Sequence, residues 1–186
     1  LPDTVLVVVD EAYFEYVDQP GYGSALELID DYPNLVVTRT FSKAYGLAAL
    51  RIGYSVSHPD VADILNRLRQ PFNVNSPALA AALAVLDDDD YLRRSIGVNR
   101  DGYNQLVTGF DSLGLAYIPS AGNFIAVQVP GDVSAIYEAL LRQGVIVRPV
   151  ALYGMPHHLR VSIGLPHENQ RFLDSLGRLL VDRDTA

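Results

Sequence analysis

The sequence predicts an α/β protein. Short apolar runs rich in β-branched residues, which favour strands, alternate with longer segments whose apolar residues recur at helical spacing. This alternation continues to the end of the chain and is typical of sheets packed against helices. Among the 186 residues, 49% are hydrophobic, which is enough to fill the core of one domain or of two small ones.

The first predicted strand is 5–9, an unbroken apolar run typical of a strand buried on both faces of a parallel sheet. Such a strand needs neighbours, and the chain enters it almost at once without an initiating methionine. We therefore expect these residues to form the later part of a longer polypeptide. Two more strands are predicted in this half, at 35–37 and 52–56.

Helices follow the third strand. Pro59 begins one, and a loop with prolines and asparagines at 70–77 ends it. Ser76 and Pro77 look like the cap and first residue of a second helix that reaches Leu86. Beyond it we predict a connecting helix at 91–112, which separates residues 1–90 from a small α/β domain at 113–186. The strands of that domain are expected at 116–118, 123–129, 144–148 and 159–163, and its helices at 133–143 and 168–182.

The net charge of −8 argues against nucleic acid or an anionic membrane as a partner. The sequence contains no cysteine, so redox chemistry does not indicate the compartment, and a bacterial cytoplasmic enzyme would fit. It contains no apolar run long enough to cross a membrane and no signal peptide. We predict no metal site. Asp87 to Asp90 form a contiguous acidic run typical of a solvated helix boundary, and the adjacent His157 and His158 have no evident third ligand.

The chemistry is expected around the predicted strand at 35–37. Hydroxyl groups and Lys43 follow this strand, and Arg51 stands eight residues further on among apolar neighbours. A partly buried lysine loses its charge readily and can form a Schiff base, whereas arginine stays charged and binds phosphate. Spacing alone leaves a solvated lysine and a surface arginine equally plausible.

The segment from Thr40 to Tyr54, TFSKAYGLAALRIGY, closely resembles the cofactor-lysine segment of fold type I pyridoxal-phosphate aminotransferases, in particular the histidinol-phosphate aminotransferase branch. The resemblance implies that Lys43 bonds covalently to pyridoxal 5′-phosphate, and that Thr40, Ser42 and Arg51 hold the cofactor phosphate. It also implies that residues 1–90 are the remainder of a cofactor-binding large domain with a mostly parallel sheet. One departure is Ala49, where that branch commonly has glycine.

Asp10 follows the first strand, and acidic groups at the carboxyl ends of strands are candidates for function. A helix cap or a solvated turn carboxylate is the alternative. The sequence Asp10-Glu11-Ala12-Tyr13 resembles the family segment whose aspartate pairs with the cofactor's pyridine nitrogen. By the same resemblance, Tyr13 hydrogen-bonds the ring hydroxyl, while Glu11 stays unassigned.

Arg148 and Arg160 lie in predicted strands, where an arginine is more often at an edge or facing solvent. The segments 120–124 and 159–164 resemble the small domain of the same aminotransferases. That likeness implies that Arg160 binds the anionic end of the substrate and that Arg148 assists with a substrate phosphate, since bidentate bonds between arginine and a dianion are strong.

The resemblance covers essentially the whole chain but corresponds to about the second half of the family. It implies transamination between histidinol phosphate and 2-oxoglutarate in histidine biosynthesis, by a homodimer in the intact protein. Two other substrate classes stay open, aromatic amino acids and a phosphorylated amino acid that is decarboxylated. A catalytically silent fragment or small-ligand-binding domain without cofactor is a third reading. A chain without the family's first half is expected to bind cofactor weakly and to turn over poorly or not at all.

Overall fold

The structure is a computed structural model that describes residues 1–2 and 4–184. The chain divides into two compact units, Leu1–Ile96 and Gly97–Ala186. The boundary falls inside helix α3 (Asp89–Ser112). Each unit has its own sheet, and each is described by itself below.

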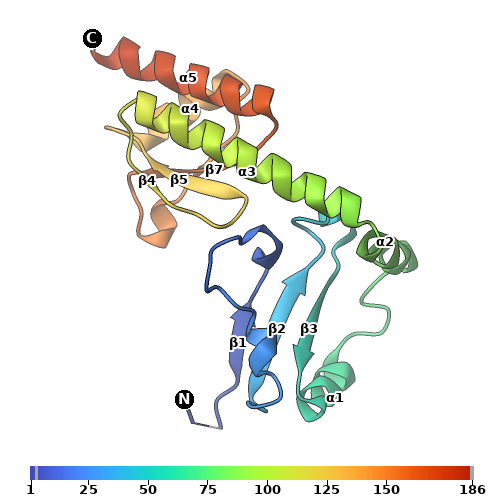
Figure 1. Cartoon of the computed structure of the whole chain (residues 1–186). Helices are drawn as coiled ribbons and strands as arrows, with labels where there is room; N and C mark the ends of the chain where they lie inside the picture. The colour runs from blue at the N-terminus through green and yellow to red at the C-terminus, as the bar shows by residue number, and fades with distance from the viewer. Residues whose placement is uncertain (3, 185–186) are drawn as a thin grey trace. The chain divides into compact units, whose positions relative to one another are not determined.

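The first unit holds a sheet of three strands with β2 in the middle (Figure 1). Strands β1 and β2 run parallel, while β3 runs antiparallel to β2. The strands are β1 (Val7–Asp10), β2 (Leu35–Thr40) and β3 (Gly53–Ser57). Short 3-10 helices η1 (Phe14–Tyr16), η2 (Ala25–Leu28) and η3 (Ala48–Leu50) lie in the connections, and α1 (Pro59–Leu68) and α2 (Ser76–Leu86) follow.

Strand β1 differs from the prediction for residues 5–9. It is an edge strand of this sheet, and its side chains alternate between half-buried and exposed, with Val8 61% exposed. The expectation that both faces are buried is therefore wrong for the described chain. An apolar sequence shows only that both faces of a strand are suited to burial. Whether they are buried depends on the elements that lie beside the strand.

The cap of α2 is Asn75, not Ser76 as predicted. The Asn75 side-chain oxygen accepts a hydrogen bond from the Ala78 amide at 2.8 Å, and Ser76 is the first helical residue. Asparagine is among the residues that cap helices best, so the helix begins one residue earlier than predicted without losing its cap. Behind the cap, Ala78 and Ala82 pack with Phe41 and Ile52 into a small core.

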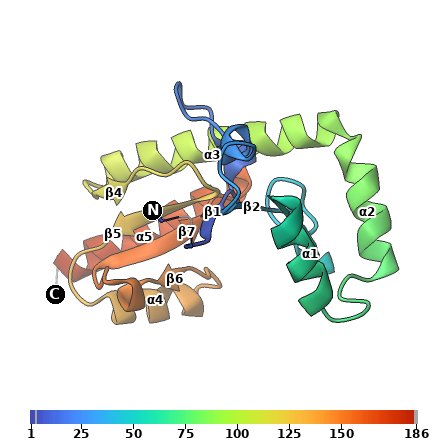
Figure 2. The same ribbon diagram turned by 90° about the horizontal axis from the view of Figure 1, so that it is seen from below.

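The second unit holds four antiparallel strands in the order β4-β5-β7-β6, with α4 and α5 beside them (Figure 2). The elements are β4 (Tyr117–Ile118), β5 (Phe124–Gln128), α4 (Val133–Arg142), β6 (Arg148–Pro149), η4 (Ala151–Tyr153), β7 (His158–Ser162) and α5 (Pro166–Asp184).

The two faces of this sheet differ in character. One face is the core, where Ile125 and Val161, directly opposite each other, pack with side chains from α3, α4 and α5. Because strand side chains alternate between faces, Ala126, Arg148 and Arg160 point to the other face. The arginines of this unit's sheet are thereby kept away from the helices.

Two details of the second unit correct the sequence prediction. Most of the strand expected at 144–148 is absent, because the chain leaving α4 bonds back to that helix, with the Gly144 amide donating to Leu141 and the Val145 amide to Leu140. Those amides are unavailable to a sheet. Strand β7 begins at His158, one residue before the predicted strand at 159–163, and ends one residue before it. Among the described residues, no helix combines the length and apolar character needed to cross a membrane.

Candidate active site

The carboxyl ends of β1 and β2 bring Asp10 beside Thr38. These two residues are partners in the parallel register, and Asp10 Oδ1 accepts hydrogen bonds from the Thr38 hydroxyl at 3.3 Å and from the Ala12 amide at 3.1 Å. Among the residues that the structure describes, Asp10 Oδ2 has no hydrogen-bond partner and the side chain forms no ion pair. Asp10 is therefore an exposed carboxylate that is oriented through one oxygen and available through the other.

Lys43 lies in a tight turn that follows β2. The turn is closed by hydrogen bonds from the Leu47 amide to Phe41 at 2.9 Å and from the Gly46 amide to Lys43 at 3.0 Å. Gly46 has a positive φ of 71°, which favours glycine, and a β-carbon there would displace the Tyr91 hydroxyl. Lys43 is half-buried, and its Nζ lies 5.2 Å from the centre of the Tyr13 ring.

Thr40, Ser42 and Arg51 belong to the same cluster. The Thr40 hydroxyl accepts from the Ser42 amide at 3.0 Å, and Arg51 Nη1 donates to the Ser42 hydroxyl at 3.4 Å and to the Ala48 carbonyl at 2.8 Å. Arg51 has a left-handed backbone (φ 54°, ψ 51°), which costs a non-glycine residue about 1–3 kcal/mol. An exposed arginine held at such a cost points to a function.

Ala49 replaces the glycine common in the resembled branch. It lies in η3, is exposed and is not among the described residues with positive φ. The added methyl group therefore meets no backbone restriction.

Arg148 and Arg160 face each other across β6 and β7. They are direct partners in the antiparallel register, and the Arg160 guanidinium lies 5.0 Å from the centre of the Phe124 ring. In the described part of the chain, neither arginine has a carboxylate within ion-pair distance. Like charges at opposed positions destabilise a sheet, and an anion between them would relieve the repulsion.

The structure thus gathers the predicted residues into two groups. Asp10, Tyr13, Thr40, Ser42, Lys43 and Arg51 lie in the first unit, and Arg148 and Arg160 lie in the second. Among the side chains that the structure describes, in residues 1–2 and 4–181, no three acidic or histidine groups are arranged to hold a metal ion.

A family model described as aminotransferase class I and II matches residues 3–176. The chain belongs to this family.

Two curated relatives of this chain are named histidinol-phosphate aminotransferases. The chain is 61% identical over 180 residues to histidinol-phosphate aminotransferase 2 of Pseudomonas aeruginosa and 57% identical over 180 residues to histidinol-phosphate aminotransferase 1 of Nitrosococcus oceani. Each match covers 97% of this chain and 49% of the relative. The chain therefore spans about half the length of the curated relatives it matches.

Solved structures agree with the fold. The histidinol-phosphate aminotransferase of Sinorhizobium meliloti, solved in complex with pyridoxal-5′-phosphate, superposes with a TM-score of 0.90 at 35% identity, and the match covers 100% of this chain and 51% of that one. The predicted likeness to the C-terminal half of fold type I aminotransferases is confirmed.

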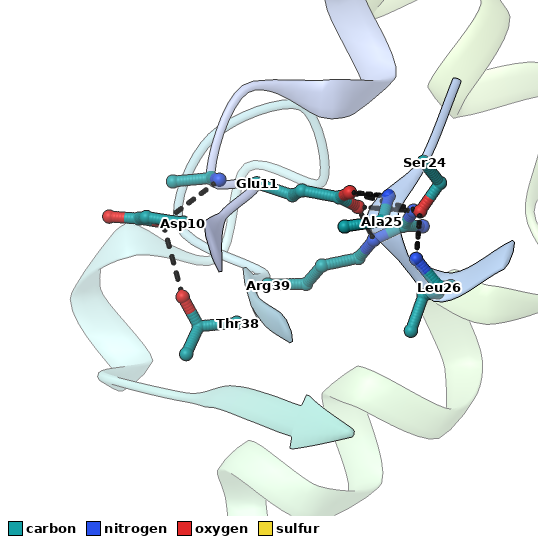
Figure 3. Close-up of polar contacts among 8 residues, drawn as sticks. Asp10, Glu11, Ser24, Ala25, Leu26, Thr38 and Arg39 are labelled. Carbon is teal, nitrogen blue, oxygen red and sulfur yellow. Dashed lines mark hydrogen bonds and ion pairs between the residues drawn. The ribbon is translucent and has the colours of Figure 1, made fainter. Parts of the chain in front are cut away.

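The first unit also contains a buried ion pair between Arg39 and Glu11, a residue to which the sequence assigns no role. Glu11 Oε2 accepts from Arg39 Nε at 3.0 Å and from Arg39 Nη2 at 2.7 Å (Figure 3). Burial by itself raises the pKa of Glu11, but hydrogen bonds from Arg39, Ala25 and Ser24 outweigh it, and the pKa lies below its ordinary value. Arg39 lies between two threonines beyond the predicted strand at 35–37, so no local pattern in the sequence indicated this pairing.

Glu15 is a second buried carboxyl group in the same unit. Neither of its oxygens has a hydrogen-bond partner among the described residues. Burial raises the pKa of Glu15 above 4.5, although the nearby Arg39 guanidinium opposes the shift. The environments of Glu11 and Glu15 therefore shift the pKa values of two neighbouring carboxyl groups in opposite directions.

Proposed function

We propose that the protein to which this chain belongs is a pyridoxal-phosphate-dependent transaminase that acts on histidinol phosphate and 2-oxoglutarate. The observation that carries the proposal is the placement of Lys43 directly after Ser42, whose hydroxyl accepts from Arg51, next to the strand that ends in Asp10. An amine, two phosphate-binding side chains and a carboxylate are the groups that a phosphorylated pyridine aldehyde needs.

The donor set fits this cofactor. Ser42 and Arg51 are already within 3.4 Å of each other and offer hydroxyl and guanidinium donors to a phosphate, and Thr40 orders the Ser42 backbone. Asp10 offers its free Oδ2 to a protonated pyridine nitrogen, and Tyr13 offers its hydroxyl to the ring hydroxyl. When bound, the cofactor acts as an electron sink for the substrate Cα.

Lys43 has two tasks in this proposal. Its amine would bind the cofactor covalently until the amino substrate displaces it. The freed Lys43 amine would then take the proton from the substrate Cα and return it at the cofactor's C4′. The Asp10 carboxylate would pair with the protonated pyridine nitrogen of a bound cofactor. The turn around Gly46 holds Lys43 in place for both tasks.

Arg148 and Arg160 are assigned to the anionic end of the substrate. Their opposed, unpaired guanidinium groups suit a phosphate dianion better than a neutral aromatic side chain. This preference supports histidinol phosphate over aromatic amino acids. The proposal also includes a homodimer and a cytoplasmic location, in keeping with a role in amino-acid biosynthesis.

A substrate panel tests the proposal. The product of the complete reading frame is supplied with pyridoxal phosphate and 2-oxoglutarate, and glutamate formation is measured with histidinol phosphate, phenylalanine and phosphothreonine as amino donors. We expect the highest kcat/KM with histidinol phosphate, and we expect the 186-residue chain alone to be weak or inactive. A preference for phenylalanine, or carbon dioxide release without glutamate, would overturn the substrate assignment.

A further inference from the structure

The Glu11–Arg39 pair lies behind the candidate site. In β2, Thr38 and Thr40 point to one face and Arg39 to the other, because strand side chains alternate. Figure 3 shows Asp10 and Thr38 bonded to each other on one side, while Glu11 and Arg39 extend together toward Ser24 and Ala25.

Every acceptor of Glu11 in this network is used. Besides the two bonds from Arg39, Oε1 accepts from the Ala25 amide at 2.6 Å, and the Ser24 hydroxyl lies 2.8 Å from Oε2 and 3.0 Å from Oε1. The Glu11 side chain is only 2% exposed, and that of Arg39 15%. A fully partnered, buried network of this kind holds its members in one arrangement.

Arg39 is held from a second direction. Its guanidinium lies 4.2 Å from the centre of the Phe14 ring, so the side chain is fixed between that ring and Glu11. Both contacts come from the segment just after β1. The end of β2 is therefore tied to the segment that directly follows Asp10.

The contacts of Glu11 and Arg39 are connected to the candidate site through the backbone. Glu11 is the next residue after Asp10, and Arg39 stands between Thr38 and Thr40, just ahead of Ser42 and Lys43. Small displacements of reacting groups are costly, about a hundredfold in rate for 1 Å. We propose that Glu11 and Arg39 are positioning residues that set where Asp10 lies relative to the Lys43 turn, an inference that rests on the proposed function.

The competing explanation is that the pair only stabilises the fold. The double variant Glu11→Met/Arg39→Met separates the two, because replacing a buried ion pair by apolar side chains often preserves stability. Ser24→Ala is a milder variant that removes the hydroxyl bonds and keeps the ion pair. Asp63→Asn is the matched control, since Asp63 and Arg67 form an ion pair in the same unit and both of their side chains are exposed.

The first measurement needs no cofactor. Amide hydrogen exchange is followed in the 186-residue chain at Ala12 and Ser42, whose amides bond to Asp10 and Thr40. We expect about tenfold faster exchange at both amides in the double variant, a smaller change in Ser24→Ala and none in Asp63→Asn, with the melting temperature of the double variant near that of the unchanged chain. Unchanged exchange at Ala12 and Ser42 would overturn the proposal.

The second measurement uses the product of the complete reading frame loaded with pyridoxal phosphate. We expect the pH midpoint of the visible absorbance of the Lys43-bound cofactor to shift in the double variant and kcat to fall about tenfold to a hundredfold with a smaller change in KM. A variant that melts differently but keeps the wild-type midpoint would show a purely structural role. If the unchanged protein takes up no cofactor at Lys43, the proposed function fails, and the exchange measurement still decides whether the pair orders the two amides.

Discussion

Arg148 and Arg160 are direct cross-strand partners with no acidic side chain between them in the described part of the chain. Opposed charges of the same sign cost a sheet about 0.2–1 kcal/mol. The arrangement therefore lowers the stability of the sheet, and an anion that bridges the two guanidinium groups would restore it.

This relationship predicts a response to inorganic phosphate. Phosphate should raise the melting temperature of the unchanged chain, and Arg160→Gln should lose most of that rise, because a charge-assisted bond contributes about 1.5–3 kcal/mol. Without phosphate, Arg148→Gln should be slightly more stable than the unchanged chain. Thermal unfolding with and without phosphate checks both points, and Arg100→Gln, an exposed arginine of α3, is the control. Equal phosphate effects in Arg160→Gln and the unchanged chain would contradict the assignment.

Glu11 predicts a loss of stability in acid. Its pKa is lowered on folding, so its contribution is present above its ordinary pKa of 4.5 and is lost as pH falls through the folded value. Glu11→Ala should lower the free energy of unfolding at neutral pH by about 3–5 kcal/mol, because Arg39 is left buried and unpaired. Urea unfolding at several pH values measures this, and the gap between the two proteins should narrow in acid. A gap that does not depend on pH would speak against the ion pair as its cause.

Glu15 predicts the opposite pH dependence. Its pKa is raised on folding, so its contribution is complete below 4.5 and is lost as pH rises through the raised value. Glu15→Gln should match the unchanged chain in acid and exceed it in stability at neutral pH and above. The melting temperature as a function of pH checks this, with Glu27→Gln, an exposed carboxyl group of the same unit, as the control. If both variants track the unchanged chain, Glu15 is not titrating in a buried site.

Much of the fold could be predicted because the periodic patterns were long. The helix predicted from Pro59 and the strand Gly53–Ser57 lie where apolar spacing indicated. The failures have local physical causes. Backbone bonds to α4 occupy the amides of Gly144 and Val145, and the exposure of Val8 depends on neighbours that no local pattern encodes.

The candidate site was predicted from motifs, and its supporting network was not. Lys43, Ser42 and Arg51 lie in one short segment, so a single resemblance named them together. Glu11, Ser24 and Arg39 are separated by 13 to 28 positions and meet only after β1 and β2 pair. The spacing of these residues in the sequence therefore does not predict that their side chains are in contact. The left-handed backbone of Arg51 was equally invisible in the sequence.

Lys43 is the only lysine in the sequence, which makes the central claim simple to test. The 186-residue chain is incubated with increasing pyridoxal phosphate, reduced with borohydride and digested, and the adduct is located by mass spectrometry. We predict an adduct on Lys43 whose half-saturating cofactor concentration rises about tenfold or more in Arg51→Gln, because the guanidinium bond to the phosphate is lost. Labelling confined to the N-terminal amine, or the same saturation curve at Lys43 in Arg51→Gln, would contradict the account.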